Sequence, residues 1–223
     1  MRRRDFLLGI AGLAATSQAR AQDANPPPAP RGLLKRCALA ALGPLGAEAG
    51  FYGDPRVRIG LHRNLARAEG LLRGMGHGRR LDELVLAMNR TAELAIAPLT
   101  PVVMQALDGM EEGEAVPAGE GAYLTARFRQ LSEAALAVRL QPIVHEAAVK
   151  AELIPAYNAL ARALSQWGVR SDIATVEAYV NRKTLDGIFL RMADEERALR
   201  APPAPEPGGA THPEIDSSQR STP

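Results

Sequence analysis

The stretch LDELVLAMNRTAELAIA, from Leu81 to Ala97, decides the fold class of this chain. Its apolar residues recur at spacings of four and three, at Leu81, Val85, Met88, Ala92 and Ala95. These spacings place side chains on one face of an α-helix, whereas a half-buried strand alternates at every second residue. The stretch therefore predicts an amphipathic helix whose apolar face packs against other helices.

The composition on both sides of this stretch also favours helix. Alanine and leucine are abundant, aromatic residues make up only 4% of the chain, and strict alternation does not extend beyond residues 56–61. We therefore expect an all-α fold, a single-domain bundle of about six to eight helices. The expected helical segments are residues 32–42, 63–75, 79–97, 101–107, 122–140, 142–152, 154–167 and 173–199.

Glycine, proline and apolar patterning define the expected arrangement of these segments. Pro98 is expected to end or kink the 79–97 helix, and the glycine-rich, acidic residues 108–121 are expected to form a surface loop. The 173–199 segment carries apolar residues on two opposite faces, which is typical of a helix surrounded by others. We expect it to lie centrally, with Gly187 permitting the close approach of a neighbour.

The N-terminal residues 1–21 have the features of a twin-arginine export signal. A pair of arginines precedes a short apolar run and a small-residue cleavage site that ends at Ala21. The apolar run is too short to span a bilayer. The sequence therefore predicts a periplasmic protein that is soluble after cleavage near Ala21.

The remaining organisation follows from low-complexity composition at both ends. Residues 22–31 are a proline-rich linker, and residues 201–223 are rich in proline, glycine and serine, so we expect disordered ends. The helical domain is expected at residues 32–200. No later segment is long and apolar enough for a transmembrane helix, so no membrane-spanning segment is expected in the mature chain.

Charge and motifs exclude several classes of function. The chain has 27 basic and 25 acidic residues, and four of its arginines but only one aspartate lie in residues 1–21, so the remainder lacks the basic excess of a nucleic-acid-binding protein. The histidines have no metal-ligand spacing, and no nucleophile or phosphate-loop motif occurs. We expect no catalytic motif, no metal site and no nucleic-acid partner, and the sequence identifies no cofactor.

Four longer stretches form a distinctive set. They are FYGDPRVRIGL at 51–61, LLRGMGHGRR at 71–80, LDELVLAMNRTAELAIA at 81–97 and LDGIFLRMADEERALR at 185–200. Together they resemble the bacterial family called domain of unknown function 4197, over roughly residues 51–200. The resemblance implies a helical, exported, envelope-associated protein, and it carries no catalytic residue over to this chain.

Polar residues border the apolar stripe of the 79–97 helix. Asp82, Asn89 and Glu93 fall on one line of this helix, and Arg90 lies on the adjoining flank. Such a line can bind a cation or a polar ligand, or it can hydrogen-bond a neighbouring helix or loop backbone, with Arg58 assisting. We favour the structural network and keep the binding site as the alternative.

A second acidic group lies on the last helix. It consists of Asp186 and the run that includes Glu195 and Glu196, which the fold could bring near Arg90. Paired carboxylates can perform acid and base chemistry when their environments separate their pKa values. An acidic run followed by arginines is also typical of a solvated helix end with local ion pairs, which is the interpretation we favour.

These observations predict a non-enzymatic periplasmic module that binds an envelope protein or a small apolar ligand. The absence of catalytic motifs and the alanine- and leucine-rich composition support this prediction. The alternative is a periplasmic enzyme or metal-binding protein that uses the carboxylate, asparagine and arginine cluster of the 79–97 helix.

Overall fold

The computed structural model describes residues 30–110, 121–164 and 173–201. Within these ranges the secondary structure is entirely helical, so the expected all-α fold class is confirmed. The helices are α1 (Pro30–Gly46), α2 (Arg63–Leu72), the π-helix η1 (Arg73–His77), α3 (Gly78–Asp108), α4 (Tyr123–Lys150), α5 (Leu153–Leu164) and α6 (Ile173–Arg200).

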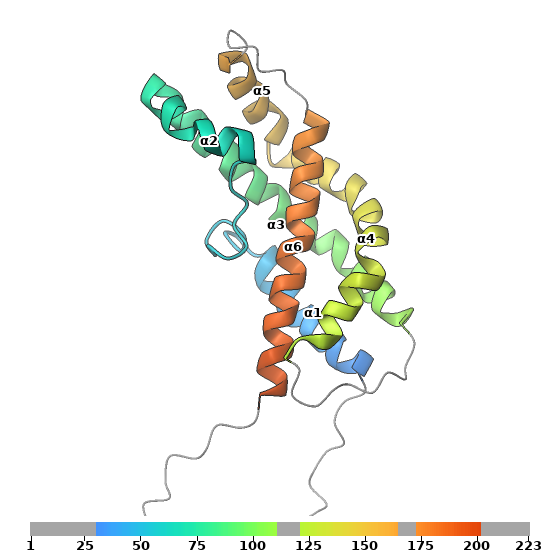
Figure 1. Ribbon diagram of the computed structural model, residues 1–223. Coiled ribbons are helices and arrows are strands. Elements are labelled where there is room, and N and C mark those ends of the chain that lie inside the picture. The colour runs from blue at the N-terminus through green and yellow to red at the C-terminus, as the bar shows by residue number, and fades with distance from the viewer. Residues whose placement is uncertain (1–29, 111–120, 165–172, 202–223) are drawn as a thin grey trace, which may run out of the picture.

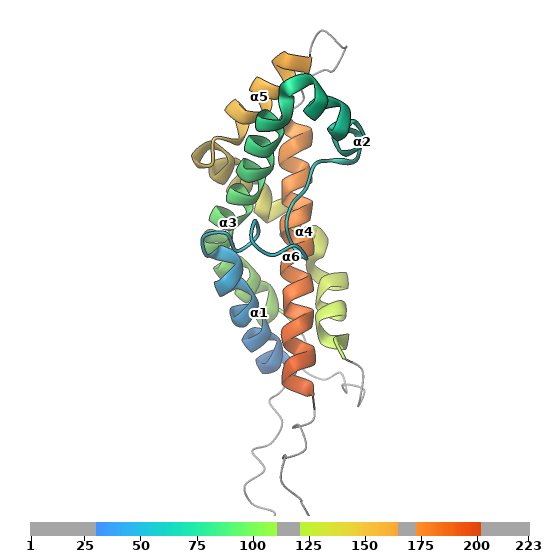
Figure 2. The same ribbon diagram turned by 90° about the vertical axis from the view of Figure 1, so that its left-hand side faces the viewer.

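The helices form an elongated bundle around α6. Figures 1 and 2 show α6 running along the molecule, with α1 and the start of α4 beside one end and α2 and α5 near the other. α6 packs against α1, α3 and α4, and α3 in turn packs against α1, α4 and α5. α6 thus packs against three helices, as its two apolar faces predict, while α3 contacts every other described helix of the bundle. No helix in the described ranges has the length and hydropathy that a bilayer span requires.

The apolar stripe that indicated the fold class forms part of the core. Each of its five residues is at most 8% exposed: Leu81, Val85, Met88, Ala92 and Ala95. The core continues along α3 through Leu99, Val103 and Leu107, all of which are fully or almost fully buried. Burial of one whole side of α3 is what fixes this long helix in the bundle.

The predicted division into eight helical segments is wrong at several prolines. α3 continues through Pro98 and Pro101, α4 continues through Pro142, and α1 extends past its expected end at residue 42 through Pro44. All four prolines are exposed, so carbonyl groups freed by the missing N–H can face water, while buried apolar residues hold the helix on both sides. The upper end of the expected number of helices is therefore too high.

The second helix is also shorter than expected. α2 ends at Leu72, and η1 follows it with Gly76 at a φ of 84°, a value that side-chain-bearing residues rarely adopt. The predicted leader at 1–21, most of the 22–31 linker, the 202–223 tail and most of the 108–121 loop lie outside the described residues. Their assignments stay predictions.

Gly187 on α6 accommodates a side chain from the connection between α1 and α2. A Cβ atom at Gly187 would lie 2.7 Å from Cε1 and 3.2 Å from Cζ of Phe51, whose side chain is fully buried. The close approach expected at Gly187 is confirmed, although the neighbour is a residue of the 47–62 segment. This contact fixes the segment against α6.

The first prediction concerns this contact. Gly187→Ala is expected to lower the free energy of unfolding by about 1–3 kcal/mol, because the added methyl group must displace the Phe51 ring within a packed core. Gly70→Ala on α2 is the matched control, since no atom lies within 4 Å of its Cβ position. Urea denaturation measures both variants, and a Gly187→Ala protein as stable as the wild type would contradict the packing described.

Candidate functional site

Asn89 holds the backbone of the 47–62 segment from the buried side of α3. Its Oδ1 accepts the backbone N–H of Ile59 at 2.8 Å, and its Nδ2 donates to the carbonyl oxygen of Ile59 at 2.8 Å. Nδ2 also donates to the Val85 carbonyl oxygen within α3 at 2.7 Å. Because Asn89 is fully buried, these bonds satisfy polar groups that water cannot reach.

Glu93 performs the same task one turn further along α3. Its Oε1 accepts the backbone N–H groups of Phe51 and Tyr52, each at 3.0 Å. Its Oε2 accepts a hydrogen bond from Arg90 at 3.0 Å, and Arg90 also bonds to Glu48. The hydrogen bonds to Glu48 and then to Glu93 raise the pKa of Arg90. A carboxylate that is only 4% exposed is thereby both paired and hydrogen-bonded.

The other two candidates of this group lie apart from Asn89 and Glu93. Asp82 is exposed and pairs with Arg73 of η1, whose hydrogen bond holds the pKa of Asp82 below its ordinary value. The Arg58 guanidinium lies 4.1 Å from the centre of the Tyr52 ring, as in a cation–π contact. The predicted polar line is therefore divided between buried backbone bonds and an exposed ion pair.

Glu196 forms a second buried carboxylate site, at the N-terminus of α4. Its two oxygens accept the backbone N–H groups of Leu124 at 3.0 Å and of Thr125 at 2.7 Å. The first N–H groups of a helix lack partners within the helix, and a carboxylate there also opposes the positive end of the helix dipole. Arg200 contributes a further bond to Glu196 at 3.2 Å. Glu196, which is fully buried, thus caps α4 from α6, and the interpretation of the acidic run as a solvated helix end is wrong for this residue.

The remaining members of the acidic group contact neither Arg90 nor one another among the interactions described. Asp186 bonds to Arg129 of α4 at 2.7 Å and to Lys183 within α6 at 3.3 Å. Glu195, next to Glu196, is partly exposed. The possible approach of these carboxylates to Arg90 does not form, because the ion pairs of Arg90 within the described ranges are with Glu48 and Glu93.

Two further groups limit the chemistry available. Cys37 is fully buried in α1, and burial, together with the charges of Glu196 and Glu195, raises the pKa of its thiol to about 11. A buried thiol with a raised pKa is a poor nucleophile. In the part of the chain that the structure describes, no cluster of three or more histidine, cysteine, aspartate or glutamate residues is arranged to hold a metal ion.

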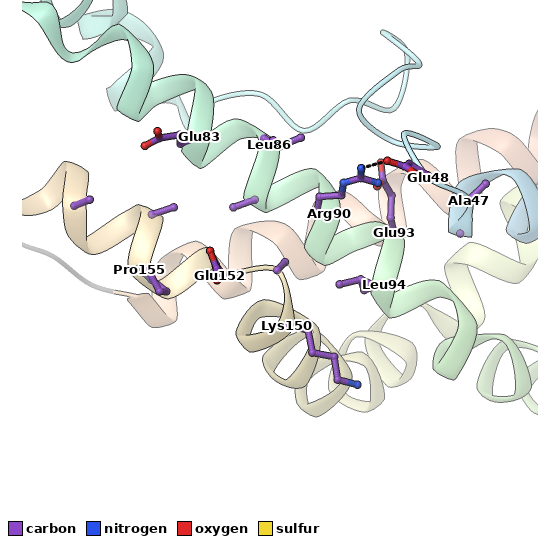
Figure 3. A pocket seen from close by; sticks show the side chains of 15 residues that line it. Ala47, Glu48, Glu83, Leu86, Arg90, Glu93, Leu94, Lys150, Glu152 and Pro155 are labelled. Carbon is purple, nitrogen blue, oxygen red and sulfur yellow. Dashed lines mark hydrogen bonds and ion pairs between the residues drawn. The ribbon is translucent and has the colours of Figure 1, made fainter.

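Arg90 and Glu93 also border an open groove between α3 and the start of α5. The groove has a volume of about 920 Å³ and passes Leu86 and Leu94 of α3. Figure 3 shows Arg90, Glu93 and Glu48 gathered at one end of it, with the dashed line marking the Arg90–Glu48 pair. Arg90, Glu48 and Glu93 already pair with one another, whereas Lys150 and Glu152 also line the groove and make no ion pair within the described residues.

A separate cavity of about 410 Å³ lies where α2, α3, α5 and α6 meet. We call it the apolar cavity, and its walls include Leu65, Ala68 and Leu72 of α2, Leu84 and Met88 of α3, Leu160, Ala161 and Leu164 of α5, and Val176 and Tyr179 of α6. Figure 1 shows α2 and α5 beside the same end of the bundle. Most of these wall residues belong to the apolar core, so the cavity is an unfilled extension of it.

Three of the polar residues that line the apolar cavity, His62, Thr175 and Tyr179, also line a neighbouring hollow, whereas Tyr157 lies on α5. The rings of His62 and Tyr179 meet edge to face with their centres 5.2 Å apart. The Tyr179 hydroxyl donates to the carbonyl oxygen of Gly60 at 3.1 Å. The edge of the cavity at Tyr179 is therefore fixed to the 47–62 segment, the same segment that Asn89 and Glu93 hold on α3.

Sequence reasoning missed this cavity. Most of its wall residues come from four separate helices and are ordinary apolar residues at helical spacing. The one available signal was the amphipathic pattern of α2, whose Leu65, Ala68 and Leu72 recur at spacings of three and four. That pattern indicates a helix with an apolar face, but it does not reveal that the face is incompletely filled.

Comparison with known proteins gives one family match. The family model described as protein of unknown function (DUF4197) matches residues 28–207, a span that includes every helix described above. No curated protein and no solved structure matches the chain.

The second prediction tests the network on α3. Asn89→Ala is expected to lower the free energy of unfolding by about 2–4 kcal/mol, because the N–H and carbonyl groups of Ile59 would be buried without partners. Asp82→Ala, on the same helix but exposed, is expected to leave stability nearly unchanged. Thermal and urea denaturation measure both variants, and equal stabilities for the two would contradict a structural role for Asn89.

The third prediction tests the cap of α4. Glu196→Gln is expected to cost about 1.5–3 kcal/mol of unfolding free energy, because one carboxylate oxygen becomes an amide nitrogen that cannot accept an N–H group. Glu195→Gln makes the same chemical change one residue away, at a partly exposed position. Hydrogen exchange at the first turn of α4 is the more specific measurement: it should accelerate in Glu196→Gln and stay unchanged in Glu195→Gln.

Proposed function

Because the chain belongs to the family of proteins of unknown function DUF4197, whose name carries no activity over to it, we propose a function from its own geometry: a binding protein for a small apolar ligand. The ligand occupies the apolar cavity between α2, α3, α5 and α6. The observation that carries this proposal is an unfilled volume of about 410 Å³ with predominantly apolar walls.

The size of the cavity supports a ligand. Protein interiors are packed about as densely as organic crystals, and voids larger than a water molecule are few. The apolar cavity is partly open to solvent, so its apolar walls are in contact with water when no ligand is bound, which is unfavourable. The volume falls within the range of small-molecule sites, about 300–1,000 Å³.

The chemistry of the walls supports an apolar ligand in particular. Ordered water inside a protein needs two to four polar partners, as a rule of thumb about three. Leucine, alanine, methionine and valine side chains provide none, and only His62, Tyr157, Thr175 and Tyr179 among the lining residues carry polar side-chain groups. An apolar molecule would cover these walls and would itself be removed from water, which is the favourable direction of the hydrophobic effect.

The structural use of the buried carboxylates supports a binding function over catalysis. Glu93 and Glu196 each accept two backbone N–H groups, so their oxygens are engaged in holding the fold. Asn89, the other buried member of the candidate cluster, is likewise bonded to backbone. An enzyme or metal site built on this cluster would have to break those bonds.

The proposed setting is the bacterial periplasm, where the predicted leader at residues 1–21 would direct the chain. A molecule of low solubility that crosses an aqueous compartment requires its apolar surface to be covered. A cavity within a helical bundle supplies that cover. The leader lies outside the described residues, and the binding proposal stands without it.

The fourth prediction tests occupation of the cavity. The neutral fluorescent probe N-phenylnaphthylamine is expected to bind the full mature chain with a rise in emission. Ala161→Phe, which adds a ring inside the cavity, is expected to weaken probe binding at least about tenfold. Ala159→Phe is the matched control, because Ala159 lies on the same helix but lines the open groove beside α3.

A second variant that fills the cavity controls for a local structural disturbance caused by Ala161→Phe. Ala68→Phe approaches the same cavity from α2. Circular dichroism should give both filling variants the wild-type helix content, since the cavity has room for the added rings. Probe binding that survives both substitutions in folded protein would exclude the apolar cavity as the site.

A further inference from the structure

We propose that the ligand is a single-chain anionic amphiphile, with its apolar chain in the apolar cavity and its anionic head group, carboxylate or phosphate, at Arg182. This inference rests on the proposed function and adds the chemical class of the ligand. It is carried by a second hollow that adjoins the apolar cavity and has the opposite chemical character.

This second hollow, which we call the Arg182 hollow, has a volume of about 330 Å³. Its lining is formed by His62, Thr175, Ala178, Tyr179 and Arg182. Three of these residues, His62, Thr175 and Tyr179, also line the apolar cavity. The two spaces are therefore neighbours whose linings meet at these residues, and the proposed ligand spans that shared edge.

The charge of the Arg182 hollow favours an anion. Arg182 carries a permanent positive charge, is exposed, and makes no ion pair within the described part of the chain. No described carboxylate lines the hollow, while Glu133 and Glu177 line a neighbouring hollow that Arg182 also borders. The adjacent acidic residue of α6, Glu177, is instead directed to His145 of α4, at 3.1 Å.

Tyr179 holds the guanidinium beside the entrance to the apolar cavity. The Arg182 guanidinium lies 5.6 Å from the centre of the Tyr179 ring, within the range of a cation–π contact. The hydroxyl of the same ring is bonded to the Gly60 carbonyl oxygen. Arg182 is therefore positioned by a ring that is itself fixed at the edge of both spaces.

Guanidinium groups suit this task. An arginine can present two parallel N–H groups to a carboxylate or a phosphate, and charge-assisted hydrogen bonds are about twice as strong as neutral ones. An apolar chain that ends in an anion thus matches both spaces, whereas a chain that ends in a cation matches only one.

The test compares ligands of equal chain length and different head group. Isothermal titration calorimetry on the full mature chain would use dodecanoate, dodecyl phosphate, dodecanol and dodecyltrimethylammonium below their micelle concentrations. The two anions are expected to bind more tightly than dodecanol, and the cation more weakly. Arg182→Gln is expected to reduce anion affinity about ten- to a hundredfold, since a charge-assisted bond is lost, and to leave dodecanol affinity unchanged.

Two further variants sharpen the result. Arg182→Lys keeps the charge but loses the paired N–H groups, so its anion affinity should fall between those of the wild type and Arg182→Gln. Arg67→Gln is the charge-matched control, because Arg67 is exposed on α2 and lines neither space. It should bind every ligand as the wild type does.

The outcomes separate this inference from the proposed function. If dodecanol and the anions bind equally well and Arg182→Gln changes neither, the head-group assignment is wrong while the apolar site stands. If the anions bind but Ala161→Phe does not weaken them, the chain lies elsewhere and both ideas fail. If none of the four ligands binds and N-phenylnaphthylamine does not bind either, the cavity is not a ligand site. A preference for carboxylate over phosphate, or the reverse, identifies the head group.

Discussion

The backbone of the segment between α1 and α2 needs hydrogen-bond partners that it cannot supply itself, and α3 provides them. Asn89 binds both polar groups of Ile59, and Glu93 binds the N–H groups of Phe51 and Tyr52. Because these atoms are buried, losing a partner would leave a backbone group without any hydrogen bond, and its desolvation would lower the free energy of unfolding. This constraint explains why an amide and a carboxylate occur within the apolar side of α3.

The same constraint links the core to the proposed site. Once the 47–62 segment is held on α3, Phe51 reaches Gly187 of α6, and Gly60 reaches the hydroxyl of Tyr179. Tyr179 in turn lines both the apolar cavity and the Arg182 hollow. The position of a binding edge on α6 is therefore determined by polar residues of another helix that never touch it. Structure and candidate function are connected through a loop whose own sequence shows little regular pattern.

The sequence predicts the features that depend on the spacing of residues within one helix. It does not predict those that depend on solvent exposure or on how separate helices pack together. Spacing alone identified the buried stripe of α3 and singled out Asn89, Glu93 and Glu196, yet it could not name their backbone partners, which are 30 to 72 residues away. It predicted a break at Pro98 because it could not show that this proline faces solvent. It missed the apolar cavity because the spacing of a leucine in the sequence does not show whether another side chain packs against it in the fold.

The carboxylate of Glu196 also determines when folding can be completed during synthesis of the chain. The N–H group of Leu124 waits for a partner that lies 72 residues later in the chain. While a ribosome is still adding those residues, the start of α4 has no acceptor from α6, and α1 can pack against α3 but not yet against α6. The bundle can close only when almost the whole helical region has emerged. Folding can therefore be completed only when synthesis of the helical region is nearly complete. A chain truncated before α6 lacks the carboxylate that caps α4.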